Sequence, residues 1–268
     1  MASEPVPPNG VLGRAANGLI VCAHRGWLAA SEAENSLATM QRTVAAGPFM
    51  LEMDLHESRN GTIFMLHDPT VDRTTDSLGK LAELDDEAIA ALRLKLPGGR
   101  MTSEPIPRFE QIARWAEATP DALLMLDIKD TPPKAAMEIV KRHGLTSRVV
   151  ILTFSKGVAR QALAADPDVL VSVLANAPAD IDDYVDLAAG RRLAFYVPRT
   201  ADPDLFSRAH RTGNLVISDV FPAIVTETSD NEADLSDPDA YREFLRGRSV
   251  DILVTNHPQT VAMVAKRH

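Results

Sequence analysis

The sequence predicts an α/β protein that folds as a single (β/α)8 TIM barrel. Short apolar runs alternate with segments of helical periodicity, which is typical of parallel strands joined by crossover helices. The length of 268 residues suits one barrel, and no internal repeat or linker divides the chain. Polar side chains that can carry chemistry follow several apolar runs, as expected where barrel strands end at a functional site.

Eight apolar runs are expected to form the barrel strands. They are residues 19–24, 49–55, 122–128, 148–154, 169–174, 193–197, 215–219 and 251–255. Eight helices are expected between and after them, at residues 32–46, 108–118, 133–143, 156–165, 181–189, 202–212, 238–246 and 259–266. In the first of these segments, Leu37, Met40 and Val44 recur at the spacing of one helical face.

A ninth apolar run, residues 62–67, follows the dipeptide Asn60-Gly61, which is a strong hairpin signal. We therefore expect residues 52–66 to form a β-hairpin at strand 2, above the barrel rim, with His67 roughly opposite Asp54. Residues 68–107 follow without strong periodicity. A loop-rich insertion of this length is usually functional, and we expect it to cover part of the barrel mouth.

The ends and the composition limit the class of protein. Residues 1–17 are expected to be a disordered lead-in, and residues 18–268 one barrel domain. Residues 1–10 lack the basic and apolar regions of a secretion signal, which predicts a cytoplasmic protein, or a periplasmic or secreted one if a signal peptide was removed. A net charge of -9 argues against nucleic acid as a partner, and with 5% aromatic residues it argues against stable membrane association. The sequence does not determine the oligomeric state.

Three carboxylates are expected to meet at the C-terminal ends of neighbouring strands. Glu52 and Asp54 are two residues apart and so point to the same face of a strand, and Asp127 lies at the end of the next barrel strand. Without a cation these groups would repel each other and raise each other's pKa. Because carboxylate oxygens favour hard cations, the sequence predicts one divalent cation, Mg²⁺ or Ca²⁺, with Mn²⁺ as a third option.

Two histidines and two basic residues complete the predicted site. His24 and Arg25 end the first strand. Lys129 follows Asp127 by two residues, and the hairpin returns His67 to the same rim. Histidine suits both proton transfers of phosphodiester cleavage because its pKa lies near neutrality. Three carboxylates, a divalent cation and two basic side chains give a formal charge of +1, which matches one phosphodiester anion.

The order of short motifs resembles that of the glycerophosphodiester phosphodiesterase family. The motifs are His24-Arg25-Gly26, Ala33-Glu34-Asn35-Ser36, Glu52-Met53-Asp54, His67-Asp68, Asp72-Arg73-Thr74-Thr75, Asp127-Ile128-Lys129 and Thr255-Asn256-His257-Pro258. The resemblance covers about residues 21–258 and is most specific up to residue 75. The chain departs from the family pattern at Ala33, Asp127, Asn256 and the segment Ile217-Ser218-Asp219, where the family has proline, glutamate, aspartate and a tryptophan-containing strand end.

The resemblance implies a metal-dependent enzyme that hydrolyses glycerophosphodiesters to glycerol 3-phosphate and an alcohol. It implies that His24 and His67 are the acid–base pair and that Arg25 and Lys129 hold the phosphate. It also implies that the metal ligands are Glu52, Asp54 and Asp127. The substrate would be a small-molecule phosphodiester, and the order of attack, by water or by a neighbouring substrate hydroxyl, stays open.

Other functions are weighed against this one. The departures near Asn256 and Asp219 leave room for a sugar or other headgroup phosphodiester as substrate. Lipid headgroup cleavage of the phospholipase D kind predicts exposed aromatic or basic patches. A metal amidohydrolase predicts a His-x-His pair, and a non-catalytic phosphate-binding barrel predicts the loss of at least one catalytic side chain.

Four residues near the motifs are given little weight. Glu34 and Asn35 are expected to open a helix, and N-terminal capping by Asn35 or Ser31 is rated level with a role near the metal. His56 and His257 lie near the rim and are assigned no role.

Overall fold

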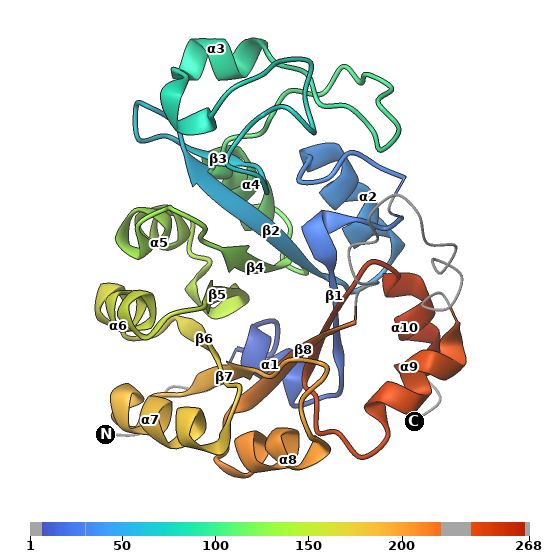
Figure 1. The fold of residues 1–268 in the computed structure, drawn as a ribbon, viewed down its shortest axis with the longest axis vertical. Helices are drawn as coiled ribbons and strands as arrows, with labels where there is room; N and C mark the ends of the chain where they lie inside the picture. The colour runs from blue at the N-terminus through green and yellow to red at the C-terminus, as the bar shows by residue number, and fades with distance from the viewer. Residues whose placement is uncertain (1–6, 30, 221–236, 266–268) are drawn as a thin grey trace.

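Parallel strands close into a barrel in the computed structural model, which describes residues 7–29, 31–220 and 237–265. Within these ranges the eight barrel strands are β1 (Ile20–Ala23), β2 (Met50–Glu57), β4 (Leu123–Asp127), β5 (Val149–Thr153), β6 (Leu170–Leu174), β7 (Leu193–Tyr196), β8 (Leu215–Val220) and β9 (Ile252–Thr255). The barrel is closed because β1 pairs with both β2 and β9. Figure 1 shows the helices that follow the strands arranged around this ring. The predicted TIM barrel is confirmed.

The helices that cover the barrel follow its strands in chain order. They are α2 (Leu37–Ala46), α4 (Phe109–Glu117), α5 (Pro133–Arg142), α6 (Lys156–Ala165), α7 (Pro178–Ala188), α8 (Pro203–Arg211), α9 (Pro238–Leu245) and α10 (Pro258–Ala265). Several begin with proline, whose missing N–H costs nothing in the first helical turn. Nowhere in the described ranges is a helix both long and apolar enough to cross a membrane.

Helix α2 begins five residues later than the sequence predicts. Ser36 is its N-cap, because the Ser36 side chain accepts a hydrogen bond of 3.1 Å from the Thr39 amide. Asn35, immediately before it, has a φ of 56°, which no helical residue adopts. The expectation that Asn35 or Ser31 caps this helix is therefore wrong. The Asn35 side chain does not cap the helix and makes a different contact, described below with the site.

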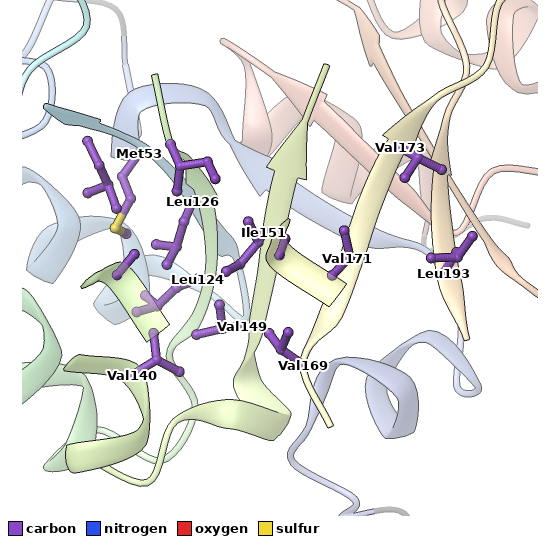
Figure 2. Close-up of a cluster of buried hydrophobic side chains, with 14 of the residues drawn as sticks. Met53, Leu124, Leu126, Val140, Val149, Ile151, Val169, Val171, Val173 and Leu193 are labelled. Carbon is purple, nitrogen blue, oxygen red and sulfur yellow. The ribbon is translucent and has the colours of Figure 1, made fainter. Parts of the chain in front are cut away.

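Alternate side chains of the strands face two different cores. The outward-facing set, which includes Met53, Leu126 and Ile151, packs against the surrounding helices (Figure 2). The inward-facing set fills the lower barrel, the half toward the N-terminal ends of the strands. It includes Met50, Leu123, Met125, Val150 and Ile252. A strand alternates its side chains with a period of two, so the residues two and four positions after Met50 must also face inward.

The N-terminal segment is more ordered than expected. Residues Val11–Ala15 form the short helix α1. Val11 is 1% exposed and packs with Ile20, Cys22 and Met50 at the N-terminal end of the barrel. The prediction of a disordered lead-in through residue 17 is wrong for these five residues, because burial of one side chain leaves no periodic pattern to detect. Residues 1–6 lie outside the described residues.

The expected hairpin is present but shorter than predicted. Strand β3 (Ile63–Met65) runs antiparallel to the end of β2, with Leu55 opposite Met65 and Glu57 opposite Ile63. Residues 52–54 stay in the barrel, where they pair with β4. The Leu66 amide donates to the Asp54 carbonyl at 3.0 Å, so the predicted pairing of His67 with Asp54 is wrong by one residue.

The insertion after the hairpin has a core of its own. It holds a 3₁₀ turn, Leu81–Glu83, and helix α3 (Asp86–Ala91), and it lies to one side of the barrel in Figure 1. A separate apolar cluster stabilises it, with Phe64, Leu66, Val71, Leu81, Ile89, Leu94 and Ile106 all buried. This packing fixes the residues between His67 and Lys95 relative to the barrel mouth.

We predict that truncating Val11 destabilises the whole barrel. Val11→Ala should lower the free energy of unfolding by about 2 kcal/mol, because it removes buried methyl groups and leaves a cavity. Chemical denaturation followed by circular dichroism measures this change. Val185→Ala, the same truncation at a residue that is 36% exposed on α7, is the matched control. Equal, small effects of both substitutions would show that α1 is not part of the folded unit.

Candidate active site

Three buried carboxylates meet at the C-terminal end of the barrel. Glu52 and Asp54 face inward from β2, and Asp127 ends β4, where it pairs directly with Asp54 in the parallel register. One oxygen from each of the three side chains lies within 4.8 Å of the others. Glu52 is 4% exposed and Asp54 is 1% exposed, so water does little to screen their charges.

The electrostatics of this cluster favour a cation. Burial raises the pKa of Glu52 well above its usual range, and repulsion by Asp54 and Asp127 adds to the rise. Burial also opposes ionisation of Asp54, but Lys129, His67 and the Asn35 amide together lower its pKa. The Lys129 ammonium lies 3.0 Å from Asp54 Oδ1 and also bonds Asp127 Oδ2.

Burial likewise raises the pKa of Asp127, although Lys129 opposes the rise. Two of the three carboxylates, Glu52 and Asp127, are therefore harder to ionise in the folded protein than in water. A hard divalent cation bound by their oxygens would remove this penalty, so the donor set suits such a cation.

Two residues with left-handed backbone conformation, Arg25 and Asn35, donate hydrogen bonds to the carboxylates. Asn35 Nδ2 donates to Asp54 Oδ2 at 2.8 Å, and the Asp54 amide donates to Asn35 Oδ1 at 3.1 Å. Arg25, with a φ of 52°, turns its backbone N–H toward Glu52 Oε2 at 2.7 Å. Such conformations persist only where the surrounding structure holds them, and they cluster at functional sites.

The two histidines are each fixed through Nδ1. His24 Nδ1 lies 2.7 Å from Asn256 Oδ1, and His24 Nε2 lies 3.9 Å from Glu52 Oε2. Burial, with the charge of Arg25, lowers the pKa of His24 to about 4. His67 Nδ1 lies 2.7 Å from Asp68 Oδ1. Holding Nδ1 selects the tautomer and orients Nε2 of each ring.

The partner of His67 is strongly ionised. Burial works against the Asp68 carboxylate, but hydrogen bonds from Arg73 and His67 outweigh it and lower the pKa of Asp68 to about 2. The His67-Asp68 motif gives no sign in the sequence of this role for Asp68. A neighbouring carboxylate is what stabilises a protonated imidazole during proton transfer.

The candidate residues line a common cavity of about 160 Å³. Its polar wall is formed by His24, Glu52, Asp54, His67, Asp127 and Lys129. Its other wall is formed by Leu152, Phe154, Tyr196 and Val254. Six of the seven predicted site residues thus surround one space, polar on one side and largely apolar on the other.

Arg25 is the seventh, and it does not line this cavity, although its Nε lies 4.0 Å from Asp54 Oδ2. Arg25 Nη1 donates to Glu34 Oε2 at 2.9 Å, and both oxygens of Glu34 also accept hydrogen bonds of 2.7 Å from Arg73. Burial alone would raise the pKa of Glu34, but these two cations lower it. Arg25 and Arg73 line a second cavity of about 400 Å³ beside the first.

His56 contributes a contact that the sequence reasoning missed. Its Nδ1 lies 2.8 Å from Asp130 Oδ1 and its Nε2 lies 3.2 Å from the His67 carbonyl oxygen, so it supports the backbone of His67. His56 is two residues after Asp54 on β2 and therefore faces the same side. The same period-two pattern that indicated Glu52 and Asp54 could have found it.

Comparison with known proteins shows which family the sequence matches. The family model of the glycerophosphoryl diester phosphodiesterase family matches residues 24–260. The chain is 25% identical over 162 residues to a glycerophosphodiester phosphodiesterase of Caldanaerobacter subterraneus subsp. tengcongensis, covering 58% of this chain and 66% of the relative. It is 28% identical over 160 residues to glycerophosphodiester phosphodiesterase 1 of Homo sapiens, covering 56% and 47%. The chain thus spans less than two thirds of the length of these relatives.

Solved structures share the fold. A glycerophosphoryl diester phosphodiesterase from Parabacteroides distasonis superposes with a TM-score of 0.81 at 24% identity, over 95% of this chain and 91% of that chain. An Oleispira antarctica phosphodiesterase in complex with the product sn-glycerol-3-phosphate superposes with a TM-score of 0.71 at 17% identity, over 94% and 98%.

We predict that a divalent cation stabilises the folded protein through the carboxylate cluster. At a concentration one hundred times its Kd, Mg²⁺, Ca²⁺ or Mn²⁺ should add about 2.7 kcal/mol, a rise in Tm of roughly 5–10 °C. Differential scanning fluorimetry of EDTA-treated protein at constant ionic strength measures the shift. Glu52→Gln should abolish it and raise the Tm of the cation-free protein, because a neutral amide avoids the burial cost that raises the pKa of this carboxyl group.

Glu57→Gln is the matched control for this prediction. Glu57 lies on the same strand, faces away from the cluster, and should keep the full cation response. A cation response of the same size in Glu52→Gln would place the cation elsewhere.

Proposed function

The chain belongs to the glycerophosphoryl diester phosphodiesterase family, and we propose that it hydrolyses a small-molecule glycerophosphodiester to glycerol 3-phosphate and an alcohol. The observation that carries the proposal is one cavity walled by three buried carboxylates, two histidines and a lysine. The product held by the Oleispira antarctica relative and the names of the relatives support the same reaction.

We infer that Glu52, Asp54 and Asp127 hold one divalent cation. When bound, it would stabilise the negative charge that develops on the phosphoryl oxygens. The Lys129 ammonium lines the same cavity and binds the phosphate in this account. Arg25, next to His24 and facing the second cavity, borders the phosphate from the other side.

The two histidines differ in the partner that each one has. His24 is held by a neutral amide, so it starts unprotonated and removes a proton from the attacking oxygen at Nε2. His67 is held by the Asp68 carboxylate, which stabilises its protonated form, so it donates a proton to the leaving alcohol oxygen. One P–O bond forms, one breaks, and the proton removed at one ring is balanced by the proton delivered at the other.

We predict that activity needs both histidines. His24→Ala and His67→Ala should each lower kcat for glycerophosphodiester hydrolysis by at least about 100-fold, the usual worth of a general acid or base. Release of glycerol 3-phosphate in a coupled enzymatic assay measures the rate. The control is His210→Ala, whose side chain is 51% exposed on α8 and whose loss should leave the rate unchanged. Full activity in both histidine variants would rule out this acid–base pair.

A second prediction concerns Asp68. Asp68→Asn should lower kcat at least about tenfold while KM changes little, because the amide no longer stabilises the protonated His67 ring. Steady-state kinetics on a substrate with a poor leaving alcohol, compared with an aryl diester, checks it. The loss should be smaller for the aryl diester, whose leaving oxygen needs no proton. Asp72→Asn, at an exposed aspartate in the same insertion, should change neither parameter. Equal losses on both substrates would contradict the role of Asp68 in proton donation.

A further inference from the structure

We propose that the second cavity binds the alcohol moiety of the substrate and selects alcohols that carry an anionic group, a phosphate or a carboxylate. This inference rests on the proposed function and names the substrate class of the same site. It concerns the cavity of about 400 Å³ between the first motif and the insertion.

The position of the cavity suits the leaving side of a diester. His24 lines the first cavity, and its hydrogen-bond partner Asn256 lines the second, at 2.7 Å from the ring. Arg25 follows His24 directly and also lines the second cavity. Arg73, which lines the second cavity, donates hydrogen bonds to Asp68, the partner of His67, so an ester arm in this cavity begins near the ring that protonates the leaving oxygen.

The charge of the lining is positive. Three basic side chains, Arg25, Arg73 and Lys95, line the cavity against one carboxylate, Glu34. Both Glu34 oxygens already accept hydrogen bonds from the two arginines, so this carboxylate has little capacity left for a cationic ligand.

Lys95 is the strongest indication of an anionic ligand. Its Nζ donates to the Asp72 backbone carbonyl at 2.7 Å, which is a neutral acceptor, and no carboxylate of the described residues forms a salt bridge with it. Thr74 lines the same cavity, is 5% exposed, and has a hydroxyl without a hydrogen-bond partner in the described part of the chain. Buried hydroxyl groups are normally satisfied, so this one suits a ligand with acceptor oxygens.

A cationic headgroup does not suit this lining. Proteins recognise quaternary ammonium groups with the faces of aromatic rings. The aromatic residue that lines this cavity is Trp27, and a cation of the protein already occupies a position near its ring. The Arg25 guanidinium already lies 5.7 Å from the Trp27 ring centroid. Choline or ethanolamine would also meet the repulsion of Lys95 and the arginines.

The test compares diesters that differ in the charge of the alcohol. The substrates are glycerophosphocholine, glycerophosphoglycerol, and glycerophosphoglycerol that carries a terminal phosphate. In the native enzyme, kcat/KM for the phosphorylated diester should exceed that for glycerophosphocholine at least about tenfold, and added salt should reduce the difference. A preference for glycerophosphocholine would overturn the proposal.

The variant Lys95→Met distinguishes selection of the substrate by charge from a general loss of activity caused by a disturbed structure. It should lower kcat/KM for the phosphorylated diester by about fivefold and raise it for glycerophosphocholine, because one repulsive charge is removed. Lys80→Met, at a 65% exposed lysine of the same insertion, is the matched control and should leave the ratio unchanged. A loss of the same size on all three substrates would show a structural role for Lys95 and overturn the inference.

Failure of the inference and failure of the proposed function give different results. If all three diesters are cleaved without a charge preference, the reaction stands and only the anionic subsite is wrong. If none of the three releases glycerol 3-phosphate with a divalent cation present, the proposed function itself is wrong.

Discussion

The burial of three carboxylates in one small volume is the constraint on which the rest of the site depends. Glu52, Asp54 and Asp127 cannot all be ionised at this depth without positive charge and hydrogen-bond donors around them. The Lys129 ammonium, the Asn35 amide and the Arg25 backbone N–H supply part of this compensation. A second layer, in which Glu34 joins Arg25 to Arg73, in turn holds the first in place.

The apolar, closely packed core below the cluster fixes the strands that carry these charges. The inward-facing residues change from Met50 to Glu52 and Asp54 along one strand, and from Met125 to Asp127 along the next. Rigid strands thus carry the charged groups, while the insertion brings His67 and Asp68 to the same rim on its own small core. The two histidines differ in the partner at Nδ1, an amide oxygen for His24 and a carboxylate for His67, and our proposal of separate base and acid roles rests on that difference.

Much of this could be predicted from the sequence, and the rest could not, for identifiable reasons. The strands and the carboxylate pair follow from a period of two, which any inward-facing strand must keep. The contact of Asn35 with Asp54 depends on a left-handed backbone that no local pattern specifies, and from the sequence alone Asn35 fits a helix cap equally well. The Glu34 to Arg73 pair joins residues 39 positions apart through the fold of the insertion. Helix α1 was missed because one buried valine gives no periodicity.

The most direct measurement of the central claim is the location of a cation at the carboxylates. Crystals grown with Mn²⁺ and measured near the manganese absorption edge would show it as a peak in the anomalous difference map. The account predicts one peak, bound by oxygens of Glu52, Asp54 and Asp127 at roughly 2.0–2.6 Å, the range of hard divalent cations. The Lys129 ammonium should then have moved from the position it holds between Asp54 and Asp127. A fully occupied peak elsewhere, with Lys129 still between these carboxylates, would contradict the account.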